Sequence, residues 1–274
     1  MYVPGMRTKR RDIDGTSLGL GLLLLGTSLV VGGQPVSYVE LKAETWVSAL
    51  ASPTGTAQTV QLSPIAMRRR LVSIRDFEAF VRTHPYWQKG RGSLLVQGTD
   101  YLKNWQQPLQ SGMESTDQQP VTWVSWYAAR AYCASEGGRL PTWFEWERVA
   151  AASGTDADAR NKPGYAQHHL DQWLAFAVTP PQGVTVNNSP NYYGLYDLHG
   201  AKWEWLEDYA AMFPSADPRD PGEGSSLALC GGAALAFRDR RDYTLMLGVA
   251  ALTALRPDDS SASVGFRCVR DWRE

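Results

Sequence analysis

The segment NYYGLYDLHGAKWEW, residues 191–205, carries two acidic side chains, Asp197 and Glu204, on either side of Gly200. Three tyrosines and two tryptophans surround them. Helices seldom hold glycine in this way, and strands seldom carry two acids beside an aromatic cluster. A glycine turn flanked by two carboxylates therefore makes this segment a candidate site.

Cysteine and histidine provide the chain's other metal-binding or nucleophilic groups. The cysteines are Cys133, Cys230 and Cys268. In an oxidising compartment two can pair and one is left over, and the sequence alone allows three pairings. His199 and Cys230 could share a metal, but nothing in the sequence brings them together. His168 and His169 lie in a polar stretch and are expected to be solvated. No Ser-His-Asp, Cys-His or zinc pattern is evident.

A charged run, RDRRD, follows near the C-terminus. It consists of Arg238, Asp239, Arg240, Arg241 and Asp242. Arginines that line a groove could hold a carboxylate or a phosphate through paired hydrogen bonds. The alternative is a solvated loop whose charges pair with one another.

The composition sets limits on the fold that positions these residues. The 274 residues carry a net charge of −1, which is too balanced for a nucleic-acid-binding surface. With 11 tryptophans, 12 tyrosines, 25 glycines and 16 prolines, the chain favours a loop-rich fold held by aromatic side chains over one built from long helices.

The first 33 residues are expected to lie outside the folded domain. Four cations precede an apolar run at residues 17–31: Arg7, Lys9, Arg10 and Arg11. The run is shorter than the roughly 20 residues that span a bilayer. It predicts a secretory signal, of the Sec or, given Arg10–Arg11, the twin-arginine type. The alternatives are an uncleaved anchor through residues 18–31 and a buried segment. The protein is then periplasmic, secreted or membrane-anchored, with one domain over residues 34–274.

Local signals predict three helices and some short strands. Ser73 can cap a helix in VSIRDFEAFVRTHPYW, with Asp76 completing a capping box and Pro85 ending the helix. The runs VSYVEL and AQTVQL are β-like. Residues 88–119 and 153–190 read as loop.

The segment after residue 120 is the most ordered. Residues 126–135 form a predicted helix that Gly137 and Gly138 end. Thr142 caps the next helix, with Glu145 three residues later. Arg139, in the linker between these helices, is well placed to bind carbonyls or a carboxylate.

Four blocks of the chain resemble the signature of the formylglycine-generating enzyme (sulfatase-modifying factor) family. In family order, over residues 73–271, they are PVTWVSWYAARAYCASEGGRLPTWFEWERVAAA, NYYGLYDLHGAKWEW, the pair Gly231–Gly232, and SASVGFRCVRD. The resemblance implies an irregular, loop-rich α+β fold related to C-type lectins. The segments HPYWQKGRGSLLVQGTDYLKNW and CGGAALAFRDRRDY resemble an exported subgroup. Some of its members are NirV-type accessory proteins of copper nitrite reductase.

The resemblance implies a structural calcium site. Its ligands are the side chains of Asp197 and Glu204 and the carbonyls of Gly200 and Lys202. Calcium takes six to eight such oxygens. The Lys202 side chain is expected to point to solvent or to Glu207. The alternative is that Asp197 caps a turn and Glu204 pairs with an arginine.

The family's copper site is the main departure. Members that oxidise a sulfatase cysteine hold copper with two cysteines a few residues after the glycine pair, and residues 233–248 contain none. Copper is therefore not expected. The resemblance pairs Cys133 with Cys268, which closes a 135-residue loop worth about 4–5 kcal/mol. The alternative is two reduced, buried thiols. Cys230 is then a lone ligand, a redox thiol or a small buried residue.

Three functions are consistent with these observations. The first is an exported accessory protein without the copper site, which binds or matures a periplasmic protein or peptide partner. The second is an oxidoreductase that acts on a peptide or small molecule, with candidate catalytic residues Cys230, Arg238, Asp239, Arg241 and Asp242. The third is a non-catalytic, lectin-like binding module.

Overall fold

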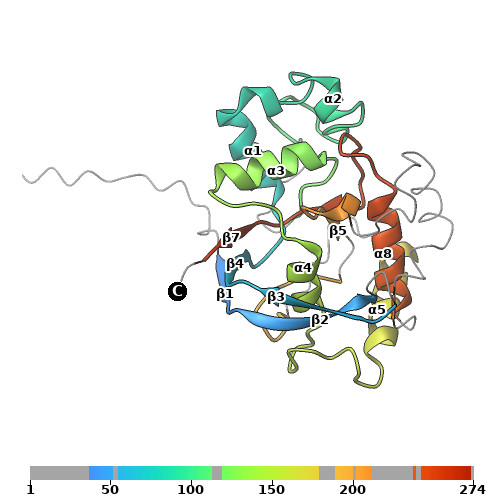
Figure 1. The fold of residues 1–274 in the computed structure, drawn as a ribbon. Coiled ribbons are helices and arrows are strands. Elements are labelled where there is room, and N and C mark those ends of the chain that lie inside the picture. The colour runs from blue at the N-terminus through green and yellow to red at the C-terminus, as the bar shows by residue number, and fades with distance from the viewer. Residues whose placement is uncertain are drawn as a thin grey trace, which may run out of the picture. The chain divides into compact units, whose positions relative to one another are not determined.

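Short strands from both ends of the domain meet in one antiparallel sheet (Figure 1). The computed structural model describes residues 37–51, 55–112, 119–178, 189–199, 202–211, 237–238 and 242–272. Strands β1 (Tyr38–Leu41), β4 (Ile65–Arg68) and β7 (Val269–Asp271) pair in the order β1-β4-β7. Met67, fully buried, lies opposite Val39 on one side and Val269 on the other. This pairing ties the start of the domain to its C-terminal segment.

Two further strand pairs complete the β-structure of the described residues. Strands β2 (Glu44–Ala51) and β3 (Ala57–Leu62) form an antiparallel hairpin. Alternate side chains of β2 are buried, namely Trp46, Ser48 and Leu50. The two-residue strands β5 (Trp203–Glu204) and β6 (Val264–Gly265) pair in parallel.

The three predicted helices are confirmed, together with their caps. Helix α1 (Ile74–Thr83) begins after Ser73, and both hydrogen bonds of the Ser73–Asp76 capping box are present. Helix α3 is Trp126–Ser135. Gly137 follows it with a φ of +75°, a conformation that glycine adopts without strain. Helix α4 (Trp143–Ala150) has the Thr142–Glu145 capping box. Arg139 binds the Glu145 carboxylate at 2.7 Å, as its position in the linker predicted.

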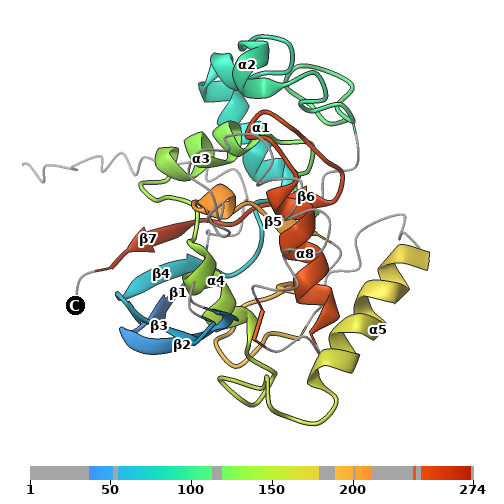
Figure 2. The same ribbon diagram turned by 45° about the vertical axis from the view of Figure 1, so that its right-hand side comes forward.

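Other helices lie where loops were expected, and there the sequence prediction is wrong. Residues 88–119 contain the short helix α2 (Leu94–Gln97). Residues 153–190 contain the 14-residue helix α5 (Tyr165–Val178). Helix α8 (Tyr243–Thr253) has apolar residues on every side. It contacts both β5 and α5 (Figure 2). The 3₁₀ turns are η1 (Pro85–Trp87) and η2 (Tyr209–Ala211).

One continuous core holds these elements together, and the fold is α+β and rich in loops. Many aromatic side chains contribute to the core, as the composition indicated: Trp105, Trp143, Trp146 and Trp205 are almost fully buried. Residues Gln34–Glu274 make one compact unit. Within the part of the chain that the structure describes, no helix is long and apolar enough to cross a membrane.

Candidate functional site

The loop between Asn191 and Glu204 is built on a side-chain-stabilised turn. The Asn191 side chain accepts hydrogen bonds from the backbone N–H groups of Tyr193 (3.1 Å) and Leu195 (3.0 Å). Asp197 then adopts a φ of +61°, in the left-handed region that few non-glycine residues visit. Glu204, further along the chain on β5, is buried in the core.

Glu204 is paired with an arginine inside the protein. Its two carboxylate oxygens accept from Nε and Nη2 of Arg267 at 2.6 and 2.8 Å. Neither side chain has any solvent exposure. Arg267 also donates to the Tyr196 carbonyl at 2.9 Å. The pair therefore joins β5, the segment after β6 and the Asp197 turn.

Asp197 is paired with a second arginine nearer the surface. Arg70 lies 3.2 Å from its carboxylate, and the same guanidinium lies over the Tyr196 ring at 3.8 Å. The half-buried Lys202 side chain reaches the surface, where its amine donates to the Ala262 carbonyl at 2.7 Å. Glu207, the other expected partner, pairs with Arg130 instead. Burial lowers the pKa of Lys202.

The Glu204–Arg267 pair matches the alternative in which Glu204 pairs with an arginine, whereas Asp197 pairs with Arg70 where that alternative had it cap a turn. Pairing with arginine leaves oxygen lone pairs for calcium, because a carboxylate offers about four acceptor positions. Calcium binding stays a prediction, and Gly200, one of its expected ligands, lies outside the described residues. Among the described residues, no three histidine, cysteine or acidic side chains are arranged to hold a metal.

The structure contains the Cys133–Cys268 disulfide, with the two Cα atoms 5.4 Å apart. It links α3 to the segment just before β7. The Cys268 carbonyl accepts from the Arg68 backbone N–H at 2.9 Å, which joins the bridge to β4. Since the chain has three cysteines in all, only Cys230 remains, and it lies outside the described residues.

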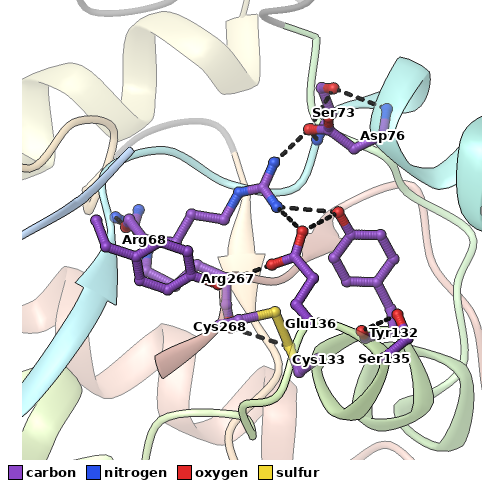
Figure 3. A network of polar contacts seen from close by, with 10 residues as sticks. Arg68, Ser73, Asp76, Tyr132, Cys133, Ser135, Glu136, Arg267 and Cys268 are labelled. Atoms are coloured by element: carbon purple, nitrogen blue, oxygen red, sulfur yellow. Dashed lines mark hydrogen bonds and ion pairs between the residues drawn. A yellow bond between two sulfur atoms is a disulfide. The ribbon is translucent and has the colours of Figure 1, made fainter. Parts of the chain in front are cut away.

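A buried polar network surrounds this bridge (Figure 3). The Arg68 guanidinium pairs with Asp76 in the first turn of α1. It also donates to the Tyr132 hydroxyl and the Glu136 carboxylate, each at 2.9 Å. Tyr132 and Glu136 belong to α3 and its C-cap, so one side chain of β4 holds two helices in place.

The charged run is only partly described. Phe237 bridges to Leu50, and the Arg238 N–H donates to the Ala49 carbonyl at 2.9 Å, so this segment lies against β2. The Arg238 side chain is exposed. Asp242 is the N-cap of α8 and accepts from the Leu245 N–H at 3.0 Å. The other candidates, Asp239 and Arg241, lie outside the described residues.

Glu147 is a buried acid that sequence reasoning missed. Its side chain is 2% exposed and accepts from Ser48 Oγ at 2.6 Å and from Trp46 Nε1 at 3.2 Å. Arg160 approaches it at 3.5 Å. Burial raises the pKa of Glu147. Because its hydrogen-bond donors come from β2, Glu147 fastens that strand to α4.

The histidines form a buried pair, which the sequence analysis did not expect. His169 lies on α5 and is 6% exposed, so the prediction that it is solvated is wrong. Its ring stacks on His199 at 3.5 Å and 17°. His199 Nε2 donates to the Ala150 carbonyl, which also accepts from the Tyr165 hydroxyl at 2.9 Å. Burial, and next the charges of His199 and His168, lower the pKa of His169 to about 2.

An apolar pocket lies between α4, β5 and α8. Its lining residues are Trp143, Trp146, Trp203, Glu204, Leu206, Leu245, Gly248, Val249 and Leu252. Gly248 permits the closest contact, because a Cβ there would lie 2.0 Å from the Trp203 ring. The resemblance would place two cysteines within residues 233–248. This stretch continues into α8, an apolar helix that packs on tryptophans.

The chain is similar in sequence to several known proteins. The sequence profile of the sulfatase-modifying factor enzyme 1-like domain matches residues 24–272. A formylglycine-generating enzyme of Thermomonospora curvata is 34% identical over 79% of this chain and 85% of its own length. The inactive C-alpha-formylglycine-generating enzyme 2 of Bos taurus is 31% identical over 90% of this chain and 92% of its own length. The crystal structure of CarF matches 87% of this chain and 99% of its own, at 17% identity and a TM-score of 0.45.

Proposed function

Because this chain belongs to the family of sulfatase-modifying factor enzyme 1-like domains, we propose that it is an exported member without the copper–thiolate site. In this proposal it binds a partner enzyme outside the cytoplasm, or assists that enzyme's maturation. The cysteine inventory carries the proposal. The chain has three cysteines and the Cys133–Cys268 disulfide uses two, so 3 − 2 = 1 thiol remains.

One thiol does not fit the copper site that the resemblance implies. Cuprous ions are held by soft sulfur ligands, and two thiolates are required in that site. Cys230 alone provides one, and residues 233–248 add none. The comparisons do not choose between activity and inactivity, because similar relatives carry both names. The number of available thiols is therefore the observation that supports the proposal.

The packing of α8 supports the same proposal. Gly248 brings this helix against Trp203, and Asp242 caps its start. Residues 242–248, the described end of the stretch 233–248, thus serve in capping and packing of the helix. A copper enzyme of the denitrification type, such as copper nitrite reductase, is the partner class that we propose from the resemblance of the 84–105 and 230–243 segments.

The biochemical test measures copper binding and aldehyde formation. The purified full chain is titrated with Cu(I) against a competing chelator, and incubated with copper, reductant, oxygen and a cysteine-containing sulfatase peptide. We expect no tight copper binding and no aldehyde, with the Thermomonospora enzyme as positive control. Stoichiometric copper that Cys230→Ser abolishes, or aldehyde formation, would return the protein to the oxidoreductase alternative.

The cellular test measures the partner. Deletion of the gene is expected to lower the activity of the partner enzyme in extracts from outside the cytoplasm. Wild type and Cys230→Ser are expected to restore that activity equally, because the proposed role does not use the thiol. Rescue by wild type alone would contradict the proposal and assign chemistry to Cys230.

A further inference from the structure

Two adjacent leucines protrude from the lobe that carries α2. Leu94 is 67% exposed and Leu95 is 84% exposed, which makes them the two most exposed large apolar side chains of the described residues. Tyr86, 49% exposed, lies beside them: its hydroxyl accepts from the Ser93 N–H at 3.4 Å. In both views α2 lies at the end of the domain remote from the β1-β4-β7 sheet (Figures 1 and 2).

The backbone beneath these leucines is held firmly. Gln97 is buried, and its amide donates to the Tyr86 carbonyl at 2.9 Å and accepts from the Gly92 N–H at 3.2 Å. The Val96 carbonyl accepts from Ser125, the N-cap of α3, at 2.7 Å. The exposure of the leucines is therefore imposed by contacts on the opposite side of α2.

The loop that leads into α2 carries two cations, Lys89 and Arg91. The acids nearest to the patch are each paired with another cation: Glu78 with Arg82, Asp100 with Lys103 and Asp258 with Arg256. The Lys89 amine donates to the carbonyls of Trp105 and Lys103, and no carboxylate pairs with it among the described residues. The Arg91 side chain is exposed, and no hydrogen bond or ion pair engages its guanidinium among the described residues.

We propose that Tyr86, Leu94 and Leu95, with Arg91 and Lys89, form a docking surface for anionic phospholipid membranes. Apolar side chains that enter the interface, together with cations that meet anionic headgroups, are sufficient for peripheral binding. Aromatic rings such as that of Tyr86 also favour the membrane–water interface. A stable protein interface buries roughly 800 Å² on each partner, far more than three protruding side chains offer, so lipid fits this patch better. The inference does not depend on the proposed function.

Vesicle partitioning of the full chain tests the proposal. Wild type is expected to bind vesicles of phosphatidylcholine with phosphatidylglycerol better than phosphatidylcholine alone, and less well in high salt. Leu94→Ser/Leu95→Ser is expected to weaken binding to anionic vesicles about tenfold, and Arg91→Gln several-fold. Leu174→Ser and Lys162→Gln alter exposed residues elsewhere and are expected to bind as wild type. All four variants are expected to keep the wild-type melting temperature.

Tryptic cleavage gives a local readout that the N-terminal apolar run does not affect. Anionic vesicles are expected to slow cleavage after Arg91 and leave cleavage after Lys162 unchanged. Equal cleavage after Arg91 with and without vesicles would overturn the proposal, as would equal binding by wild type and the double-leucine variant. Failure of wild type to bind either vesicle would also overturn it and leave a protein as the occupant.

Discussion

At the scale of single residues, the pairing of Glu204 with Arg267 determines how the candidate loop is held. Both side chains are fully buried and bonded through two hydrogen bonds, so each would be a buried, uncompensated charge without the other. Such a pair need not stabilise more than an apolar contact would, but breaking it on one side is costly.

Glu204→Gln is expected to lower the free energy of unfolding by about 3–5 kcal/mol, because Arg267 loses its countercharge while the side-chain shape is kept. Urea denaturation measures the change. Asp259→Asn breaks the surface pair with Arg256, whose side chain is 73% exposed. This substitution is expected to lower the free energy of unfolding by less than about 1 kcal/mol. Equal effects of the two substitutions would contradict the assignment of a buried pair.

Calcium binding is tested on the same loop. A bound ion stabilises the folded state in proportion to the logarithm of its concentration over Kd. Calcium added to chelator-treated wild type is expected to raise the melting temperature, and Asp197→Asn is expected to abolish the rise. A wild-type melting temperature that is the same in calcium and in chelator would rule out the calcium site and leave the ion pairs alone.

The stacked histidines predict a specific pH dependence. The pKa of His169 lies below its ordinary value of about 6.5 in the folded state, so its contribution to stability is complete above pH 6.5 and is lost as the pH falls. The loss is about 1.4 kcal/mol per pH unit. Between pH 7 and 5, wild type is expected to lose about 2 kcal/mol more than His169→Phe, which keeps a stacked ring.

Denaturation curves at several pH values measure that difference. His168→Gln is the matched control, because His168 is exposed and its neighbour is not. The control is expected to follow the wild-type pH profile. A pH profile of His169→Phe that is identical to that of wild type would mean that His169 is not buried as a neutral ring.

At the scale of elements, α8 depends on one glycine. Gly248→Ala would improve helix propensity by about 1 kcal/mol, but the added methyl overlaps the Trp203 ring. We expect a net destabilisation of about 1–3 kcal/mol and an altered near-UV circular dichroism signal from the tryptophans. Ala251→Gly, at an exposed position of the same helix, is expected to cost about 1 kcal/mol without the spectral change. A more stable Gly248→Ala variant would show that α8 does not pack on Trp203.

At the scale of the whole molecule, the disulfide closes most of the domain into one loop. The bridge spans 135 residues, and its removal is expected to cost about 2–5 kcal/mol, measured as a lower melting temperature in reductant. Thiol titration of the denatured chain is expected to find one free thiol, and three after reduction. Cys230→Ser is expected to leave the melting temperature unchanged. This variant is expected to have no free thiol before reduction. Three thiols before reduction would restore the reduced alternative and remove the main argument against a copper site.

Features whose partners lie close in the chain were predictable from the sequence. Ser73 with Asp76, and Thr142 with Glu145, are three residues apart, so each capping box is a local hydrogen-bond pattern that neighbouring residue types reveal. The cysteine number, and with it the shortage of thiols, also follows from the sequence once the family's pairing is applied. The family's α+β, loop-rich fold came from the order of its signature blocks.

Only the tertiary structure decided which distant groups meet. Glu204 and Arg267 are 63 residues apart, and neither carries a local signal that names the other. Helix α5 follows Pro163 and Gly164, residues typical of a turn, and the burial of His169 depends on His199, which arrives from a different loop. Local hydrogen bonds are chosen by adjacent residues, whereas long-range pairs are chosen by how the core closes. The stability of the buried charges therefore comes from the packing of the whole domain.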